Sequence, residues 1–98
     1  MKFAATAMLL MPIATQACAT YQFCHCMNND GVPNYSATKQ ICDGLGPSKG
    51  SMQGPSWQSS ADECRAADGK SLDNCSWRQW CKLAGATGTD SWCRQKQT

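Results

Sequence analysis

The ten residues Cys18-Ala-Thr-Tyr-Gln-Phe-Cys-His-Cys-Met27 organise the rest of the chain, because they contain three of its eight cysteines. In an extended strand, successive side chains point to opposite faces. Cys18, Cys24 and Cys26 would then share one face. The other face would carry the odd-numbered residues Ala19, Tyr21, Phe23, His25 and Met27. The Cβ vectors of Cys24 and Cys26 do not converge, so these two cysteines cannot bond each other. Cys18 lies too far along the strand to bond either of them. Each of the three cysteines is therefore expected to bond a cysteine elsewhere.

Residues 1–17 have the features of a secretory signal peptide. The chain begins Met1-Lys2, continues with an apolar run from Phe3 to Ile13, and ends this segment in Thr15-Gln16-Ala17. The run is too short to be a transmembrane helix, which needs about 20 apolar residues. Cleavage after Ala17 keeps all the cysteines and leaves residues 18–98. We expect this mature chain to be a single disulfide-stapled domain.

The cysteine content predicts four disulfides and no free thiol. A chain of this size has a marginal hydrophobic core, and each disulfide contributes about 2–4 kcal/mol to its stability. All eight cysteines are expected to pair: Cys18, Cys24, Cys26, Cys42, Cys64, Cys75, Cys81 and Cys93. A bond between Cys75 and Cys81 is excluded, because a helix would separate them by about 9 Å along its axis. The other pairings stay open.

Two helices are predicted after the first strand. Asn34 is a good N-cap for a helix that ends at Gly44 or Gly46. The second helix is expected to start at Ser76, because Ser76 and Gln79 have the spacing of a capping box, and to end at Gly85. This start places Cys75 just before the helix.

The remaining segments are read as loops and short strands. Residues 46–60 are rich in Gly, Pro and Ser, which predicts a long surface loop. Weak strand character in residues 56–67 predicts a short hairpin that closes near residues 60–62 or ends at 68–69. Residues 91–95 are expected to form a last strand, with Trp92 and Cys93 on opposite faces. The fold class is therefore α+β, a small disulfide-rich sandwich with two helices packed on one face of a short antiparallel sheet.

Charge and candidate ligands argue against several functions. The formal net charge is only +2, which disfavours nucleic-acid binding and membrane lysis. Cys24-His25-Cys26 could suggest a zinc site, but on a strand His25 points away from both sulfurs, and an oxidising compartment consumes the thiols. The spacing of Asp62-Glu63 and the other carboxylates supports no catalytic pair. We therefore expect no enzyme activity, metal, cofactor or membrane insertion, and a monomer.

Aromatic residues are the candidates for partner binding. Trp77 and Trp80 fall on the apolar face of the second helix and are expected in the core, whereas Trp57 and Trp92 could stack on a sugar or contact a protein. Tyr21 and Phe23 have two interpretations. They either form an exposed aromatic patch on the face opposite the cysteines or belong to the core.

Two tripeptides match the pattern for N-glycosylation. They begin at Asn34 and Asn74. Asn34 follows a flexible turn, whereas the second tripeptide contains a cysteine expected to form a disulfide. Any glycan is therefore expected at Asn34 rather than at Asn74.

Several motifs together resemble those of small secreted cysteine-rich proteins of filamentous fungi. The matching pieces are Cys24-His-Cys26, Asp30-Gly31, Thr38 to Cys42, Asp73 to Cys81, Gly85 and Asp90-Ser-Trp-Cys93. Many such proteins are candidate effectors that plant-associated fungi release into host tissue. The order strand, helix, hairpin, helix, strand also looks like the α/β sandwich of killer-toxin-like effectors.

The resemblance implies a secreted, non-enzymatic effector that binds a host protein or carbohydrate, outside the fungal cell and in the host apoplast. One alternative is an antimicrobial or killer-type toxin against competing microbes. The other is a protease inhibitor that uses residues 46–60 as its reactive segment. No functional residue is carried over from the resemblance.

Overall fold

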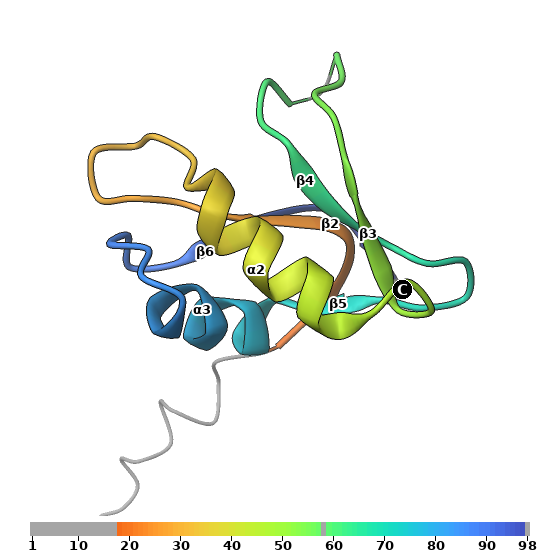
Figure 1. The fold of residues 1–98 in the computed structure, drawn as a ribbon. Coiled ribbons are helices and arrows are strands. Elements are labelled where there is room, and N and C mark those ends of the chain that lie inside the picture. Colours follow the sequence, from red (N-terminus) through yellow and green to blue (C-terminus); the bar gives the residue numbers. More distant parts are fainter. Residues whose placement is uncertain (1–17, 58, 98) are drawn as a thin grey trace, which may run out of the picture.

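The computed structural model describes residues 18–57 and 59–97. The predicted signal peptide, residues 1–17, lies outside them. The elements follow in the order β2 (Thr20–Cys26), α2 (Tyr35–Leu45), β3 (Gly50–Gln53), β4 (Glu63–Ala66), β5 (Leu72–Asp73), α3 (Asn74–Leu83) and β6 (Ser91–Gln97). Two helices pack against one face of a five-stranded antiparallel sheet (Figure 1). The predicted α+β fold class is confirmed.

Strand β2 is the centre of the sheet. Strand β6 pairs with β2 along its whole length, from Thr20 opposite Gln97 to Cys26 opposite Ser91. On the other side, β4 pairs with the middle of β2 and β5 with its beginning. Strand β3 extends the sheet beyond β4. Residues 18–27, which were expected to organise the chain, therefore supply the strand that lies between the other strands of the sheet.

Helix α2 begins and ends as predicted. The side-chain oxygen of Asn34 accepts a hydrogen bond from the backbone N–H of Ala37 at 2.9 Å, and Gly46 ends the helix with a positive φ of 89°. The hydroxyl of Thr38 donates to the carbonyl of Asn34 and accepts from the backbone N–H of Cys26, at 2.8 and 2.9 Å. This buried hydroxyl ties the first turn of α2 to the end of β2.

The predicted start of the second helix is wrong. The N-cap of α3 is Asp73, whose carboxylate accepts hydrogen bonds from the backbone N–H groups of Cys75 and Ser76 and from the Ser76 hydroxyl. A carboxylate satisfies more N–H groups than a serine hydroxyl and interacts favourably with the helix dipole. The helix therefore starts earlier, and Cys75 lies in its first turn.

The predicted long loop contains a strand, and the predicted hairpin is placed wrongly. Strand β3 lies within residues 46–60 and pairs with β4, so the hairpin is closed by residues 54–62. A Cβ atom on Gly50 would lie 3.1 Å from the Cys64 sulfur and from the Arg65 carbonyl oxygen. Glycine permits this close pairing and at the same time gives the segment the composition of a loop.

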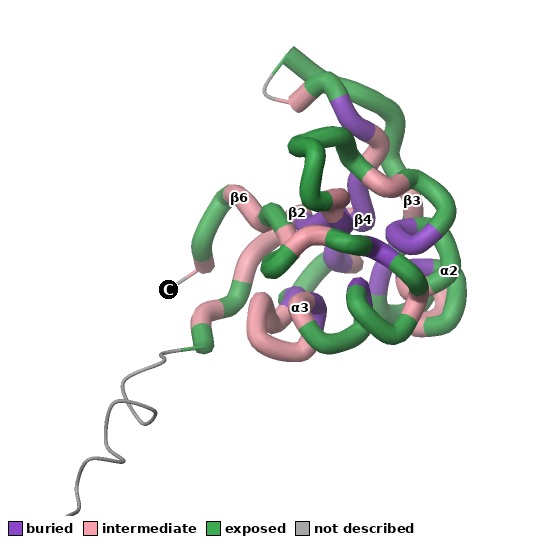
Figure 2. Tube along the Cα trace, turned by 90° about the vertical axis from the view of Figure 1, so that its left-hand side faces the viewer, coloured by how far each residue is buried: buried purple, intermediate pink, exposed green. Residues whose placement is uncertain are grey.

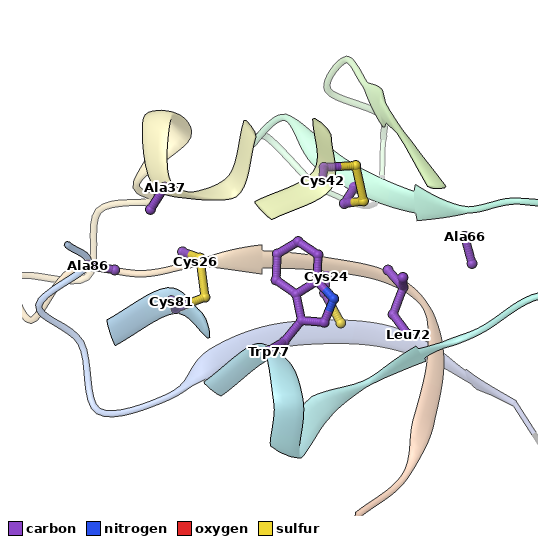
Figure 3. Close-up of a cluster of buried hydrophobic side chains, with 10 residues drawn as sticks. Cys24, Cys26, Ala37, Cys42, Ala66, Leu72, Trp77, Cys81 and Ala86 are labelled. Atoms are coloured by element: carbon purple, nitrogen blue, oxygen red, sulfur yellow. A yellow bond between two sulfur atoms is a disulfide. The ribbon is translucent and has the colours of Figure 1, made fainter. Parts of the chain in front are cut away.

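The core lies between the helices and the sheet, and half of the ten buried residues in its cluster are disulfide-bonded cysteines. Trp77 is fully buried in the middle of a cluster that includes Leu72 and Ala66 (Figure 3). Three disulfides join this cluster, Cys24–Cys93, Cys26–Cys81 and Cys42–Cys64. The fourth, Cys18–Cys75, joins the exposed start of the described chain to α3. As expected, the three cysteines of the first segment all bond outside it, and Cys75 and Cys81 do not bond each other.

Trp80 is a further correction, because it was expected in the core. It is 36% exposed and touches Trp77 edge-on, with 6.4 Å between ring centroids. Trp80 lines a shallow apolar groove of about 340 Å³ between the two helices, with Ile41, Leu45 and Leu83. The helices approach each other closely enough to bury Trp77 but leave Trp80 at their outer surface.

Candidate binding face

The side of the sheet away from the helices carries the candidate site. Because Cys24 and Cys26 face the helices, Phe23, His25 and Met27 point the other way, as predicted. Tyr21 was expected on that side too, but it lies opposite Leu72 of β5 and packs against the core cluster. Strand register adds side chains from the strands on both sides of β2. We call this surface the helix-free face and define it by Phe23, His25, Met27, Glu63, Arg65, Trp92 and Arg94.

A buried ion pair crosses this face. Glu63 on β4 is 2% exposed, and the Arg94 side chain on β6 is 12% exposed. The Arg94 guanidinium donates to the Glu63 carboxylate through Nη2 at 2.8 Å and Nε at 3.1 Å. To reach Glu63 it passes over β2, with its central carbon 4.0 Å from the centroid of the Phe23 ring. The pair therefore clamps the two strands that flank β2.

His25 lies beside this ion pair and is 4% exposed. Its Nδ1 atom is 3.4 Å from Oε2 of Glu63 but lacks hydrogen-bond geometry, so the two groups are close without being hydrogen-bonded. Its Nε2 atom lies 3.2 Å from the sulfur of Met27. Burial lowers the pKa of His25 below its ordinary value, and the neighbouring Glu63 carboxylate opposes only part of this effect. The imidazole is therefore neutral at neutral pH.

The same cluster anchors the loop of residues 54–62. Nη2 of Arg94 lies 3.3 Å from the hydroxyl of Ser56. Ser56 and Ser59 exchange two backbone hydrogen bonds, of 2.8 and 3.2 Å, which close a tight turn. Trp57, in this turn, is 91% exposed. The loop therefore presents a tryptophan to solvent from a base fixed to the sheet. Figure 2 shows that this end of the molecule is largely exposed around a small buried segment.

Trp92 lies on the helix-free face and is 42% exposed. Its indole packs against the His25 ring, with 5.1 Å between centroids. Two depressions, of about 300 and 330 Å³, meet at Trp92, and Met27 and Gly31 also line both. Cys93, the next residue along β6, is held in the core by its bond to Cys24. This part of β6 is therefore held on one face of the sheet by the contact of Trp92 with His25 and on the other face by the disulfide of Cys93.

The two interpretations of Tyr21 and Phe23 are each partly right. Both residues are half-buried. Phe23 lies on the helix-free face beneath Arg94, whereas Tyr21 packs against the edge of the core cluster. Tyr21 also lines a small depression of about 180 Å³ together with Trp92. Of the four predicted contact residues, only Trp57 and Trp92 are well exposed.

The two candidate glycosylation sites are both half-buried and hydrogen-bonded. The Asn34 amide donates to the side chain of Asn28 at 3.1 Å. Asn74 accepts from the backbone N–H of Ala19 at 2.8 Å. The preference for Asn34 stays a prediction.

The cysteines that could have bound a metal are bonded to one another in disulfides. His25 lies on the opposite face of β2 from the sulfurs of Cys24 and Cys26, as expected. Within residues 18–57 and 59–97, one group of potential ligands comes together, formed by Cys18, Asp73 and Cys75. Its two sulfur atoms are bonded to each other.

The association of Glu63, His25 and Arg94 was missed from the sequence. The sequence alone indicates no partner for either Glu63 or His25. The disulfide pairing could have revealed this association. If Cys24 bonds Cys93 and the two lie opposite each other on paired strands, Phe23 lies beside Arg94 and His25 beside Trp92.

Comparison with models of known protein families, with characterised proteins and with solved structures finds no match. In the part of the chain that the structure describes, neither helix has the length and apolar character needed to cross a membrane. Four disulfides in so short a chain are typical of proteins that fold in an oxidising, extracellular compartment.

Proposed function

We propose that this protein is a secreted, non-enzymatic binding protein of the fungal effector type, and that it binds a host molecule through the helix-free face. The observation that carries the proposal is Trp92, an exposed tryptophan with two depressions beside it. Tryptophan is enriched among residues that dominate binding energy, because it combines a large contact area with few rotatable bonds.

The surroundings of Trp92 support a preformed site. The indole packs on His25, and the neighbouring Cys93 is cross-linked to Cys24 on the next strand. Arg94 follows directly and is locked by Glu63. A side chain that is already held in place loses little conformational entropy on binding.

The burial of two acid–base groups on the helix-free face, Glu63 and His25, supports the non-enzymatic part of the proposal. The Glu63 carboxylate is engaged by Arg94 and is 2% exposed, and the His25 imidazole is 4% exposed. A general acid or base must come within hydrogen-bond reach of its substrate. These two groups instead hold the face together.

The matched variants Trp92→Ala and Trp80→Ala test the proposal. Both residues are partly exposed, but Trp80 lies on the helix side of the molecule. Immobilised protein should capture a component of host extracellular fluid, Trp92→Ala should lose most of this capture, and Trp80→Ala should retain it. Equal capture by the wild type and a folded Trp92→Ala variant would contradict the proposal. Two other results would also contradict it: inhibition of microbial growth that does not depend on Trp92, and stoichiometric inhibition of an extracellular protease that does not depend on Trp92.

A further inference from the structure

We propose that the ligand of the helix-free face is a neutral oligosaccharide, with one sugar ring stacked on Trp92 and the adjoining rings in the two depressions beside it. This inference rests on the proposed binding function and names its ligand class. It follows from the chemistry of the two depressions, from their lack of uncompensated charge and from their position on either side of one indole.

The first depression is lined by small polar and apolar groups. Ser59 and Ser60 contribute hydroxyls from the anchored loop, and Pro33 and Ala61 contribute apolar contacts. The His25 ring forms part of the floor. Ligand sites of this kind combine mostly apolar walls with a few polar groups, and about 300 Å³ is at the lower end of their volume range.

The second depression is lined by more polar residues than the first. Its lining includes Asn28, Asn29, Thr89, Asp90 and Ser91, which bring amide, hydroxyl and carboxylate groups to one surface. Amides and hydroxyls both donate and accept hydrogen bonds. They can therefore pair with sugar hydroxyls, which also donate and accept.

Neither depression offers an uncompensated charge. No Lys or Arg lines either of them within the described residues. The one carboxylate, Asp90, accepts a hydrogen bond from Nε of Arg78 at 3.0 Å, and the buried His25 is neutral at neutral pH. An anionic or cationic ligand would lose hydration without gaining an opposite charge, so a neutral ligand fits best.

Three exposed polar side chains at this surface are available to a ligand. In the described chain, the side chains of Asn29, Ser60 and Thr89 make no hydrogen bond to another residue. Beside them, the flat face of Trp92 suits the apolar C–H face of a sugar ring. A pyranose presents such a face together with a rim of hydroxyls, and this pairing matches the lining.

The arrangement favours a chain of sugars over a single one. Because Trp92, Met27 and Gly31 line both depressions, the depressions adjoin each other. A linear trisaccharide can place its central ring on the indole and one ring on each side. A monosaccharide fills one of these positions and forfeits the others.

Isothermal titration with defined sugars tests the inference. The panel contains neutral trisaccharides and hexasaccharides of glucose, xylose, mannose and N-acetylglucosamine, with trigalacturonic acid as the anionic probe and the free monosaccharides as length controls. At least one neutral oligosaccharide should bind more tightly than its monosaccharide and than the anionic probe. Trp92→Ala should weaken this binding by about tenfold, the upper end of what one stacked aromatic ring contributes. Trp80→Ala should leave it unchanged.

A second pair of substitutions keeps the test independent of Trp92. Asn29→Ala and Thr89→Ala remove exposed groups that make no side-chain hydrogen bond in the described chain, so these variants should fold, and together they should weaken binding. Absence of binding across the neutral panel, or tighter binding of trigalacturonic acid, would overturn the inference. Should capture from host fluid depend on Trp92 while no oligosaccharide binds, the ligand is of another class and the binding function stands. If capture does not depend on Trp92, the binding function fails as well.

Discussion

Arg94 reaches across β2 to hold both carboxylate oxygens of Glu63, at 2.8 Å from Oε1 through Nη2 and at 3.2 Å from Oε2 through Nε. The two residues belong to strands that do not pair with each other. The ion pair therefore adds a connection that the backbone ladder lacks. It also fixes Ser56 in the loop that carries Trp57.

Breaking this ion pair from one side should be costly. Glu63→Gln or Arg94→Met leaves a buried, partly unpaired polar group, which typically costs about 3–5 kcal/mol of unfolding free energy. Arg78→Met is the matched control, because its ion pair with Asp90 is exposed, and such pairs contribute about 0–1 kcal/mol. Urea unfolding at neutral pH measures all three. Equal losses for Arg94→Met and Arg78→Met would show that the buried pair has no special role.

Acidification should destabilise the protein through His25. Burial lowers its folded-state pKa, so the unfolded chain binds a proton more readily. The contribution of His25 is therefore present above its unfolded pKa of about 6.5 and is lost as pH falls towards the lowered folded value. The charged groups that face the ring are Glu63, which favours the protonated form, and Arg94, which opposes it.

The variant His25→Phe separates this effect from the titration of surface carboxylates. Urea unfolding at a series of pH values from neutral down to about pH 5 should give a shallower decline for the variant than for the wild type. Parallel curves would mean that His25 does not titrate differently on folding.

The loss of stability on removing a disulfide should depend on how deeply the disulfide is buried rather than on the length of the loop that it closes. Cys18–Cys75 spans 57 residues and Cys42–Cys64 spans 22, so the chain-entropy model favours the first by about 0.8 kcal/mol. Cys42 and Cys64 are buried in the core, however, and removing two buried sulfurs costs about 1–3 kcal/mol more. The double alanine variant of Cys42 and Cys64 should therefore unfold at lower urea concentration than that of Cys18 and Cys75. The reverse order would show that the loop-closure entropy of the unfolded chain outweighs the burial of the sulfur atoms.

The fold was largely predictable because its signals are local. Alternation along residues 18–27 placed the cysteines on one face, and Asn34 marked the start of α2. Strand β3 escaped detection because Gly50 and its neighbours have the composition of a loop. A strand of this kind is stabilised by its partner β4, and sequence periodicity does not show that pairing.

The candidate site was predictable only in part. Trp57 and Trp92 were expected to be exposed, and the structure places them there. The cluster beneath Trp92 depends on register between strands that are far apart in the sequence. Without the disulfide pairing, nothing indicates that Glu63, His25 and Arg94 meet.

Phe23 should stabilise the helix-free face through its ring. Phe23→Leu keeps apolar volume but removes the contact with the Arg94 guanidinium, a type of interaction that contributes about 0.5–2 kcal/mol. Phe23→Ala should cost more, because it also leaves a space beneath Arg94. Thermal unfolding should rank the proteins wild type, Phe23→Leu, Phe23→Ala. An unchanged midpoint for both variants would show that the ring is not part of the packed structure.

Oxidative footprinting of the four tryptophans tests the location of the binding site most directly, whatever the ligand. In the free protein, Trp57, Trp92 and Trp80 should react and the buried Trp77 should not. In the complex with the component captured from host fluid, Trp92 should be protected most and Trp57 in part, while Trp80 reacts as before. Protection of Trp80 with unchanged reactivity of Trp92 would place the site on the helices and contradict the account.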